Sequence, residues 1–593
     1  MDLTDATCVP TGGQFQHPAP AMIDFSWAPP LYEHPVHHRR PVRIAAVGAG
    51  FSGLCAAIHF QEGLEDFELT IYEKADDVGG VWNANRYPGV ACDVPSHSYQ
   101  FSFAENTQWS AYYAPGREIH QYLRNVASQY DLNKYIKLRH SVRSATWDID
   151  QGQWTVEVED LATGQVFTDT VDFVVYATGL LSKPLWPNIP DKEEYKGTLL
   201  HSGTWDAAEF ESQLGFSWGD KRVGVIGAGA SAVQIVPYLQ KRAKEVINFG
   251  RSKVWLASGW GSKMLSALQP DNDDGRNYVF TEKQKELFKE SHTYRAWRAE
   301  IERDLGSSHQ LTLQGNPLQA VYKEKLTGLM TKKSLKKPEV AEALMPDFPV
   351  GCKRLTPGPG YIEALCEDNC DLVTTPIERF TPNGIMTADG VEHEFDIIVC
   401  ATGYNVNGVP GFPIYGIGGV NIQDAWMKES RTYLGLFSAE LPNHFHILTH
   451  QSAVGSGSQL VVLERQCQYM TKVIAKCQRD GYRSIVPKKS AVDDNMKYAD
   501  DYFKRAVYST NCKSWYKVGQ AGAATIRSIW PGSGLHYYQA LKHPRWEDFE
   551  YERANTHDHS MSWLGNGDSL PGIDGATVYH DMRSFYKSHV TFN

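Results

Sequence analysis

Apolar residues along this chain occur in short continuous runs, each followed by a glycine-rich turn and a helix-like pattern. Residues 42–60, VRIAAVGAGFSGLCAAIHF, show this order, and residues 221–239, KRVGVIGAGASAVQIVPYL, repeat it. A parallel strand that is buried on both faces is a near-continuous apolar run. Each stretch therefore predicts a buried strand, a tight turn and a helix.

The first turn has the spacing of a dinucleotide-binding fingerprint, with glycines at positions 48, 50 and 53. Gly48 permits the sharp turn, Gly50 lets a pyrophosphate approach the backbone, and Gly53 lets the helix pack on the strand. The amides at the helix N-terminus then face the phosphates. The next predicted strand, ELTIYEKA, ends near Glu73, where a carboxylate accepts hydrogen bonds from a ribose. This combination predicts a dinucleotide site.

The second turn carries Gly227, Gly229 and Ala232, and its following strand, KEVINFGRS, ends in Arg251 rather than in an acid. A carboxylate would repel the 2′-phosphate of NADP, whereas a guanidinium pairs with it bidentately. We therefore expect the second site to prefer NADPH to NADH. The alternative for Arg251 is a solvated surface charge.

Two further apolar runs close on Ala-Thr-Gly, one in DFVVYATGLLSKP and one in DIIVCATGYN. Such small-residue turns let the chain cross between domains, so one dinucleotide domain is predicted to be inserted into another. The fold class is therefore α/β, with two nested Rossmann-like domains. The predicted boundaries are an N-terminal extension at 1–40, an outer domain at 41–186 and 396–545, an inserted domain at 187–395, and a C-terminal tail at 546–593.

A charged, helix-prone stretch lies within the inserted domain. It begins at Thr281, a residue type that caps helices, and continues with apolar residues at helical intervals to Leu305. We expect a helical insert at about 265–345.

Length, composition and charge limit the classes of binding partner that we expect. The chain has 593 residues, of which 42% are hydrophobic, and a net charge of -11. This length exceeds what one core organises, and the charge gives no basic field for nucleic acid or an anionic membrane. No apolar stretch reaches the roughly 18 to 20 residues of a membrane span, and residues 1–40 lack the apolar core of a secretory signal. We expect a cytoplasmic monomer with small-molecule partners.

The ten cysteines are scattered and show no repeated C-x-x-C spacing. We therefore expect no zinc or other metal site, and reduced thiols. His34, His37 and His38 in the N-terminal extension could ligate a metal, but a solvated arm is the simpler interpretation.

Residues 195–205, YKGTLLHSGTW, lie between the two glycine-rich turns. The stretch resembles the signature of the type I, class B flavoprotein monooxygenases known as Baeyer-Villiger monooxygenases, F-x-G-x-x-x-H-x-x-x-W followed by proline or aspartate. Gly197, His201, Trp205 and Asp206 match it, and Tyr195 keeps an aromatic ring in place of phenylalanine. The similarity extends from residue 41 to about 545 and includes GGVWNANRYPGVACDVPSHSYQFSF and GCKRLTPGPGYIEAL.

The resemblance implies FAD in the outer domain and NADPH or NADP in the inserted domain. It identifies Arg354 as the active-site arginine and Asp93 as the carboxylate that orients it; an ordinary interdomain ion pair is the alternative. Lys353 is expected to contact the NADP phosphate together with Arg251. The resemblance implies further cofactor contacts from Trp82, Ser231, Ser252 and Trp515.

Trp515 resembles the tryptophan of a mobile loop that closes over the nicotinamide ribose, and a packed surface aromatic is its alternative. The signature lies where the inserted domain joins the outer one, so we expect it to act as a hinge. In that role His201 would bond to main chain while Trp205 packs across the junction. A plain core histidine is the alternative for His201.

The implied reaction is NADPH- and O2-dependent oxidation of a ketone to an ester or lactone through a peroxyflavin intermediate. An anionic peroxide requires a fixed cation in a site shielded from water, which is the role expected of Arg354. No residue identifies the ketone, and we favour aliphatic or cyclic ketones.

Three alternative functions fit part of this sequence pattern. An N- or S-oxygenating flavin monooxygenase shares both fingerprints, but Trp205 with Asp206 and the CKR arginine argue against it. A thiol-disulfide flavoreductase needs a redox cysteine pair beside the flavin, and Cys366 and Cys370 have the wrong spacing. A cofactor-binding protein without catalysis would not need Asp93, Lys353 and Arg354, and ketone-dependent NADPH consumption separates it from an enzyme.

Overall fold

The structure is a computed structural model that describes residues 34–36, 38–213, 215–257, 259, 261–269, 277–512, 514–518, 525–554 and 561–567. These residues fall in two compact units, one of residues 39–554 and one of residues 1–38 with 555–593. Most of the predicted extension and tail, including His37, lies outside the described residues. In the smaller unit the rings of His34 and His38 stack at 4.1 Å, and the carbonyl of His34 accepts a hydrogen bond from the amide of Asn566.

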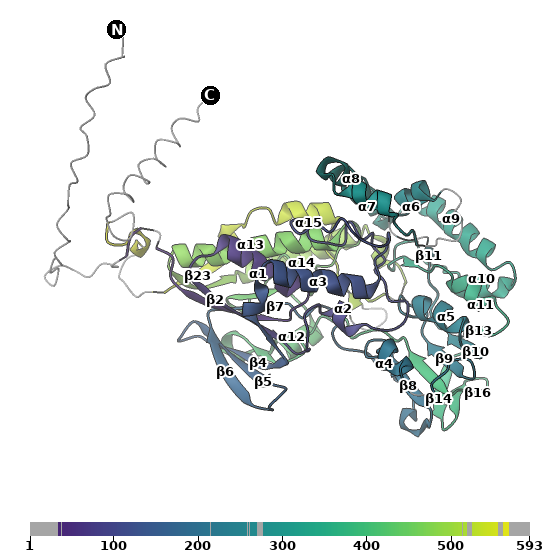
Figure 1. The fold of residues 1–593 in the computed structure, drawn as a ribbon. Coiled ribbons are helices and arrows are strands. Elements are labelled where there is room, and N and C mark those ends of the chain that lie inside the picture. The colour runs from purple at the N-terminus through teal and green to yellow at the C-terminus, as the bar shows by residue number, and fades with distance from the viewer. Residues whose placement is uncertain are drawn as a thin grey trace, which may run out of the picture. The chain divides into compact units, whose positions relative to one another are not determined.

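The first large sheet of the main unit is parallel and has five strands (Figure 1). Its strands, in spatial order, are β19 (His444–His446), β7 (Phe173–Tyr176), β1 (Val42–Val47), β2 (Phe67–Glu73) and β3 (Ile136–Leu138). Five of the six residues of β1 are buried, as the apolar run predicts for a central strand.

The second large sheet is also parallel and five-stranded (Figure 1). Its strands, in spatial order, are β13 (Cys370–Val373), β10 (Glu245–Phe249), β9 (Arg222–Ile226), β17 (Ile397–Cys400) and β8 (Thr198–His201). The sequence pattern places both fingerprints directly after a central strand, and the structure has β1 and β9 in those positions. The α/β fold class with parallel sheets is therefore confirmed.

The chain crosses between the two sheets twice, and the second crossing differs from the expected boundary. It leaves the first sheet after β7, enters the second at β8, and returns to the first at β19. We placed residues from 396 onward in the outer domain, but β17 pairs with β8 and β9 in the second sheet. All four β17 residues are buried there, so the crossing follows Cys400.

The two crossings lie side by side. The amide of Leu185 donates to the carbonyl of Gly403, and the amide of Asn405 donates to the carbonyl of Lys183, each at 2.9 Å. The segments that follow the two Ala-Thr-Gly turns therefore form one paired connection between the sheets.

Several smaller sheets are separate from the two large ones. An antiparallel meander of β4 (His140–Asp148), β5 (Gln153–Asp160) and β6 (Val166–Val171) carries the short β18 (Ile414–Tyr415) at its edge. The other small strands are β14 (Ile377–Thr381) with β15 (Gly384–Thr387) and β16 (Glu392–Glu394), β20 (Tyr482–Pro487) with β23 (Phe549–Arg553), β11 (Leu256–Ala257) with β12 (Thr356–Pro357), and β21 (Lys517–Val518) with β22 (Thr525–Ile526).

Helices α1 (Phe51–Gly63) and α13 (Gln459–Arg479) pack together within the core of the first sheet. The first ten residues of α1 are all buried, because the helix lies between the sheet and α13. The remaining helices outside the insert are α2 (Val81–Ala84), α3 (Gly116–Gln129), α4 (Ala207–Glu211), α5 (Ala232–Gln240), α11 (Tyr361–Leu365), α12 (Ile422–Lys428), α14 (Lys489–Phe503) and α15 (Gly534–Ala540).

The helical insert consists of α6 (Ser262–Leu268), α7 (Glu282–Phe288), α8 (Ser291–Ser307), α9 (Leu318–Lys333) and α10 (Pro338–Leu344). Thr281 caps α7 through a capping box with Gln284, as its residue type suggests. The single helix-prone stretch from 281 to 305 forms two helices, and Phe288 and Tyr294 on either side of the break both pack against the buried His97 ring. The insert is thereby fastened to the loop that follows α2.

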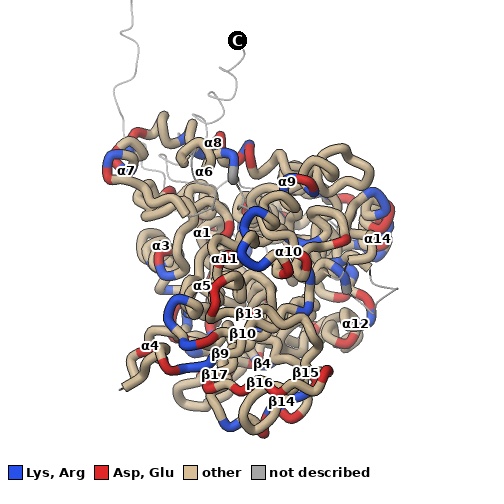
Figure 2. The backbone as a smooth tube through the Cα atoms, turned by 90° about the vertical axis from the view of Figure 1, so that its right-hand side faces the viewer, with Lys and Arg blue, Asp and Glu red and all other residues tan. Residues whose placement is uncertain are grey.

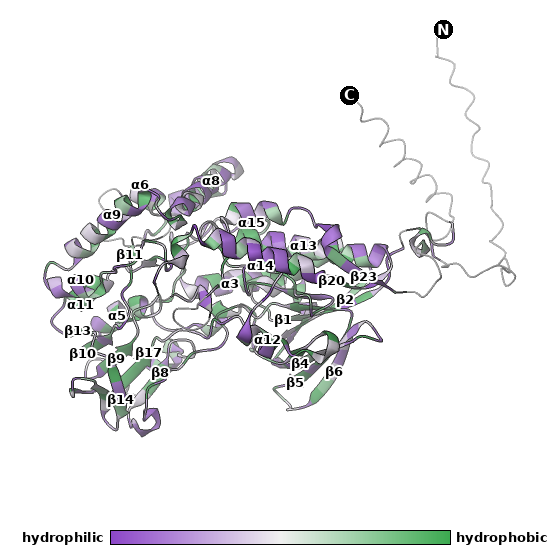
Figure 3. Ribbon diagram, turned by 180° about the vertical axis from the view of Figure 1, so that it is seen from behind, coloured by the Kyte–Doolittle hydropathy of each residue, from purple (hydrophilic) through white to green (hydrophobic). Residues whose placement is uncertain are grey.

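Hydropathy follows these layers. Figure 3 shows the apolar, green strands of both large sheets beneath helices whose outer positions are purple. Basic and acidic residues are interspersed along the chain in the view of Figure 2, without a single basic face there. No helix in the described ranges is both long and apolar enough to cross a bilayer.

Candidate active site

One cavity of about 1790 Å³ is lined by residues that follow strands of both large sheets. Pockets for one drug-sized ligand have volumes of roughly 300 to 1,000 Å³, so this cavity is larger than one such ligand requires. The wall contains most of the cofactor residues expected from the sequence: Gly48, Gly50, Glu73, Trp82, Asp93, Gly227, Gly229, Ser231, Arg251, Ser252, Lys353, Arg354 and Trp515.

The glycines of the first fingerprint are required by close backbone approaches. Gly48 has φ +107°, and a Cβ on it would lie 2.8 Å from the carbonyl oxygen of Ala177. A Cβ on Gly53 would lie 2.0 Å from the carbonyl oxygen of Gly48, which is why the helix can pack so closely on the strand. Gly53 itself does not line the cavity, whereas Gly50 does.

The second fingerprint repeats this geometry. Gly227 has φ +125°, and a Cβ on it would lie 2.4 Å from the carbonyl oxygen of Ala401. The two Ala-Thr-Gly turns, which contain Ala177 and Ala401, therefore each cover the first glycine of a fingerprint. A Cβ on Gly229 would meet no atom within 4 Å, so this backbone is open to a ligand pyrophosphate.

The residues expected to distinguish the two riboses line the cavity near the ends of β2 and β10. Glu73 is the last residue of β2, and its carboxylate accepts hydrogen bonds from the amides of Ala49 and Ala75, each at 2.8 Å. Those bonds aim the carboxylate across the end of the strand. Arg251 follows β10 at the corresponding place and is exposed at the cavity wall.

Arg354 and Asp93 form a two-bond ion pair in the cavity wall. The Nε of Arg354 donates to Oδ2 of Asp93 at 2.8 Å, and its Nη2 donates to Oδ1 at 2.7 Å. Burial alone would lower the pKa of Arg354, but the Asp93 carboxylate outweighs it and raises that pKa above its ordinary value. The arginine therefore stays charged at every working pH while the pair fixes the plane of its guanidinium group.

The other expected cofactor residues surround this pair. Trp82 on α2 donates its indole N–H to the hydroxyl of Tyr99 at 3.2 Å, and Ser231 precedes α5. The ammonium group of Lys353 donates to the carbonyl of Lys253 and lies 4.7 Å from the centre of the Phe348 ring. Trp515 is 38% exposed and lines the cavity, and its ring also packs on that of Tyr516.

The Ala453–Gly457 turn also lines the cavity. Tyr516, next to Trp515, lines the cavity as well. Burial raises the pKa of Tyr516 to about 12, and the neighbouring positive charge of Arg354 acts in the opposite direction. Its hydroxyl group is therefore neutral near pH 7.

The signature residues Tyr195, Gly197, His201 and Trp205 do not line the cavity. The hydroxyl of Tyr195 donates to the carbonyl of Phe395 at 3.0 Å. The hydroxyl group, which a phenylalanine at this position would not have, therefore has a hydrogen-bond partner. A Cβ on Gly197 would lie 2.3 Å from that hydroxyl oxygen and 2.7 Å from the carbonyl oxygen of Asp396. Only glycine therefore fits beneath the tyrosine ring.

His201 is fully buried and bonds to main chain on both ring nitrogens. Its Nδ1 accepts from the amide of Gly203 at 3.0 Å, so the ring proton resides on Nε2, which lies 3.3 Å from the carbonyl of Leu185. Burial lowers the pKa of His201, which keeps the ring neutral. The ring of Trp186 packs on it at 5.1 Å between centres. The histidine thus connects β8 to the first crossing.

Trp205 and Asp206 connect the signature to the loop that carries Asp93. Trp205 is 2% exposed and belongs to the same apolar cluster as Tyr87. The carboxylate of Asp206 caps α4 and pairs with Arg86 at 3.1 Å, and the amide of Ala207 donates to the carbonyl of Arg86. The pKa of Asp206 lies below its ordinary value, because these bonds outweigh the opposing effect of burial.

Sequence reasoning missed Tyr404, which follows the second Ala-Thr-Gly turn. Its hydroxyl donates to Oδ1 of Asn85 at 2.5 Å, and its ring faces that of His201 edge-on at 6.4 Å. A Cβ on Gly203 would lie 2.7 Å from the same hydroxyl. The available signal was its place beside a predicted crossing, whereas its partner at position 85 could not be read from the sequence.

The expectation of reduced thiols is wrong for two cysteines. Cys352 and Cys512 form a disulfide, and the other cysteines in the described ranges are free. Their separation of 160 residues has no motif spacing, and only the fold brings the two side chains together. The described residues contain no group of three or more side chains suited to hold a metal ion.

Comparisons with known proteins agree with this geometry. Residues 41–266 match the family described as Flavin-binding monooxygenase-like. The chain is 34% identical over 533 residues to FAD-binding monooxygenase tazF of Aspergillus terreus, which covers 89% of this chain and 92% of that protein. It is 30% identical over 520 residues to a Baeyer-Villiger monooxygenase of Streptomyces coelicolor, covering 86% and 92%.

A solved structure, an oxidized steroid monooxygenase bound to NADP, superimposes with a TM-score of 0.70 at 25% identity and covers 86% of this chain and 99% of that one. The two relatives each cover at least 86% of this chain. The chain therefore belongs to the Baeyer-Villiger monooxygenase family of FAD-binding monooxygenases.

Proposed function

We propose that the protein uses NADPH and O2 to oxidise a ketone to an ester or lactone, with FAD as its flavin cofactor. The observation that carries this proposal is the Arg354–Asp93 ion pair in the wall of a cavity that both dinucleotide fingerprints share. This arrangement supplies a fixed cation at the point where two cofactors would meet. The relatives named above support the same class of reaction.

The residues of the first sheet fit FAD. Gly48 and Gly50 leave the backbone at the α1 N-terminus accessible to a pyrophosphate, and Glu73 offers a carboxylate at the ribose position. The residues of the second sheet fit NADPH. Gly229 leaves the backbone of the second fingerprint open. Arg251 and Lys353 bring positive charge to the cavity wall, where a 2′-phosphate would bind.

FAD, reduced by NADPH, supplies the reaction with O2 and the oxygen transfer; the chain positions the reactants and supplies charge. Arg354 stabilises negative charge on the oxygen nucleophile that attacks the ketone carbon, because its guanidinium group cannot lose its proton. Asp93 holds that group in one plane through its bonds to Nε and Nη2. Because the pair is half-buried, the attraction between Arg354 and Asp93 and the attraction of Arg354 for the anionic oxygen are each stronger than they would be in water.

The signature is proposed to act as the hinge between the two sheets. It lies off the cavity, yet His201 bonds to the first crossing and Asp206 bonds to Arg86 on the loop that also carries Asp93. A rotation of the second sheet would therefore move the Asp93 loop together with the coenzyme.

The test is product analysis with purified, FAD-loaded protein, NADPH and a panel of linear aliphatic, cyclic, aryl and steroid ketones under 18O2. The expected result is ketone-dependent NADPH oxidation with one labelled oxygen in an ester or lactone, aliphatic or cyclic ketones being preferred. Oxygenation of amine or sulfide probes with no ester from any ketone would instead identify an N- or S-oxygenating enzyme. NADPH binding without any product would identify a protein without this catalysis.

A further inference from the structure

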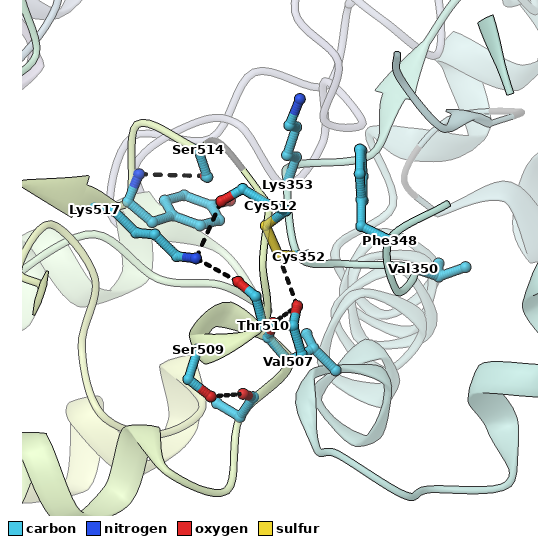
Figure 4. Close-up of a disulfide and its surroundings, with 12 residues drawn as sticks. Phe348, Val350, Cys352, Lys353, Val507, Ser509, Thr510, Cys512, Ser514 and Lys517 are labelled. Carbon is cyan, nitrogen blue, oxygen red and sulfur yellow. Dashed lines mark hydrogen bonds between the residues drawn. A yellow bond between two sulfur atoms is a disulfide. The ribbon is translucent and has the colours of Figure 1, made fainter. Parts of the chain in front are cut away.

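The disulfide between Cys352 and Cys512 joins two segments that each carry cavity residues (Figure 4). Cys352 directly precedes Lys353 and Arg354, and Cys512 precedes the Ser514–Tyr516 segment. The Cα atoms of the pair are 6.5 Å apart, a distance that suits a disulfide. The bond therefore connects the expected phosphate-binding and peroxide-stabilising side chains to the segment that contains Trp515.

The disulfide lies behind the cavity wall and not in it. Lys353, Arg354, Trp515 and Tyr516 line the cavity, whereas neither cysteine does. Cys352 is fully buried and Cys512 is 5% exposed. Both belong to an apolar cluster whose larger members are Phe503, Tyr508, Tyr516, Ile526 and Ile529. A bond in this place can position wall residues without touching substrate or cofactor.

Other contacts hold each of the two segments separately. The ammonium group of Lys517 donates to the carbonyls of Thr510 and Cys512 at 2.6 and 3.0 Å, which closes the base of the Trp515 segment (Figure 4). The side chain of Gln319 donates to the carbonyl of Val350 at 2.9 Å, and that of Gln314 donates to the carbonyl of Ala506 at 2.8 Å. Loss of the disulfide therefore leaves both segments attached to the fold, while the covalent bond between them disappears.

We propose that the Cys352–Cys512 disulfide is a reversible cross-link that positions Lys353 and Arg354 against the Trp515 segment, and that its reduction weakens coenzyme binding and increases the release of hydrogen peroxide. The second effect rests on the proposed function, whereas the first requires only that NADP binds in the cavity. Fixing two wall segments relative to each other lowers the entropy lost when a ligand bridges them.

Hydrogen peroxide is the oxidant that this cross-link requires. When NADPH oxidation is not followed by oxygen transfer, O2 takes up two electrons and two protons and leaves as hydrogen peroxide. One cysteine thiolate then attacks the peroxide, becomes a sulfenic acid and releases one water. The second thiol displaces that hydroxyl group as another water, which forms the S–S bond. In total two thiols and one peroxide become one disulfide and two waters, and a dithiol reverses the change by thiol-disulfide exchange.

The cross-link itself is tested by peptide mapping without reductant. Full-length, FAD-loaded protein is treated with dithiothreitol, freed of it, and divided into samples with and without hydrogen peroxide. A peptide pair containing Cys352 and Cys512 is expected after peroxide and not after dithiothreitol. Two free thiols at these positions after peroxide treatment would overturn the proposal, whatever the catalytic activity.

The positioning role is tested with Cys352→Ser, Cys512→Ser and the double variant, with Cys366→Ser as the matched control at a buried free cysteine. Each cross-link variant is expected to retain FAD but to bind NADP about fivefold more weakly, the lower range of coupling between linked sites. The fraction of NADPH oxidation that ends as hydrogen peroxide should rise, while the rate of flavin reduction at saturating NADPH changes little. Dithiothreitol should produce the same changes in the wild type and none in the double variant.

Equal NADP affinity in the oxidised wild type, the reduced wild type and the double variant would show that the bond has no positioning role. If a serine variant fails to fold, the comparison of oxidised with reduced wild type decides the same question. Because NADP binding needs no ketone, this measurement separates failure of the cross-link proposal from failure of the proposed reaction.

Discussion

Arg354 and Asp93 are 261 positions apart in the chain and meet through two hydrogen bonds of 2.8 and 2.7 Å. Asp93 lies in the loop that follows α2 in the first sheet's domain, whereas Arg354 precedes β12 beside the second sheet. The pair therefore forms only when the two dinucleotide domains are assembled. It links the position of the expected catalytic cation to the arrangement of the domains.

Arg354→Ala is expected to retain bound FAD and to lose ester formation by about a hundredfold or more, the effect of removing one preorganised stabilising group. The deciding quantity is ester formed per NADPH oxidised, measured beside hydrogen peroxide release. Arg354→Lys should restore little, because an ammonium group lacks the planar two-bond geometry. Normal coupling in the alanine variant would show that Arg354 is only a structural ion-pair member.

Asp93→Asn is expected to lower ester formation by roughly tenfold to a hundredfold, since a hydrogen bond to a charged group contributes about 1.5–3 kcal/mol. The Asp93→Asn/Arg354→Ala double variant should be no worse than Arg354→Ala alone, because the carboxylate acts through the arginine. Steady-state kinetics of all three variants check this. Additive losses would mean that Asp93 has a separate role.

Arg251→Ala is expected to raise the KM for NADPH by at least about tenfold, since a charge-assisted contact to phosphate contributes roughly 1.5–3 kcal/mol. The weaker reaction with NADH should be nearly unchanged, because NADH has no 2′-phosphate. Parallel measurements with both coenzymes decide between this role and a solvated surface charge. Equal losses with NADPH and NADH would contradict the assignment.

Alanine substitutions at the two glycines of the second fingerprint are expected to have different effects. Gly229→Ala adds a Cβ that meets no protein atom within 4 Å, so the melting temperature should stay constant while the KM for NADPH rises several-fold. Gly227→Ala places a Cβ 2.4 Å from a carbonyl oxygen at φ +125°. It should destabilise the fold by roughly 1–3 kcal/mol. Thermal unfolding and coenzyme titration of both variants test the distinction.

Tyr404→Phe removes the hydroxyl that bonds Asn85 and keeps the ring beside His201. A net hydrogen bond contributes about 0.5–1.5 kcal/mol, so hydrogen peroxide release relative to ester should rise roughly twofold to tenfold. The matched control is Tyr195→Phe, which removes a hydroxyl bonded outside the cavity and restores the family's signature residue. Equal coupling in the two variants would show that the bond between Tyr404 and Asn85 does not affect coupling.

The local chemistry of this protein was readable from the sequence because it depends on residue types at short spacing. Gly48 and Gly227 each have positive φ beneath a carbonyl oxygen, a requirement that glycine alone meets without strain. Glu73 and Arg251 could be singled out because Glu73 ends, and Arg251 closely follows, the strand that comes after the helix of each fingerprint. The glycine of the signature is also explained by a residue within a three-residue span, because Gly197 lies under the Tyr195 hydroxyl.

Only the tertiary structure decided which distant residues meet. Tyr404 with Asn85, Asp206 with Arg86, and Cys352 with Cys512 are each separated by more than a hundred positions. Their contacts depend on how the two chain crossings and the insert are arranged in space, and no local sequence pattern encodes that arrangement. The same reason explains the misplaced β17, whose apolar run suits either sheet. Its membership is settled by main-chain hydrogen bonds to β8 and β9, which carry no residue-type signal.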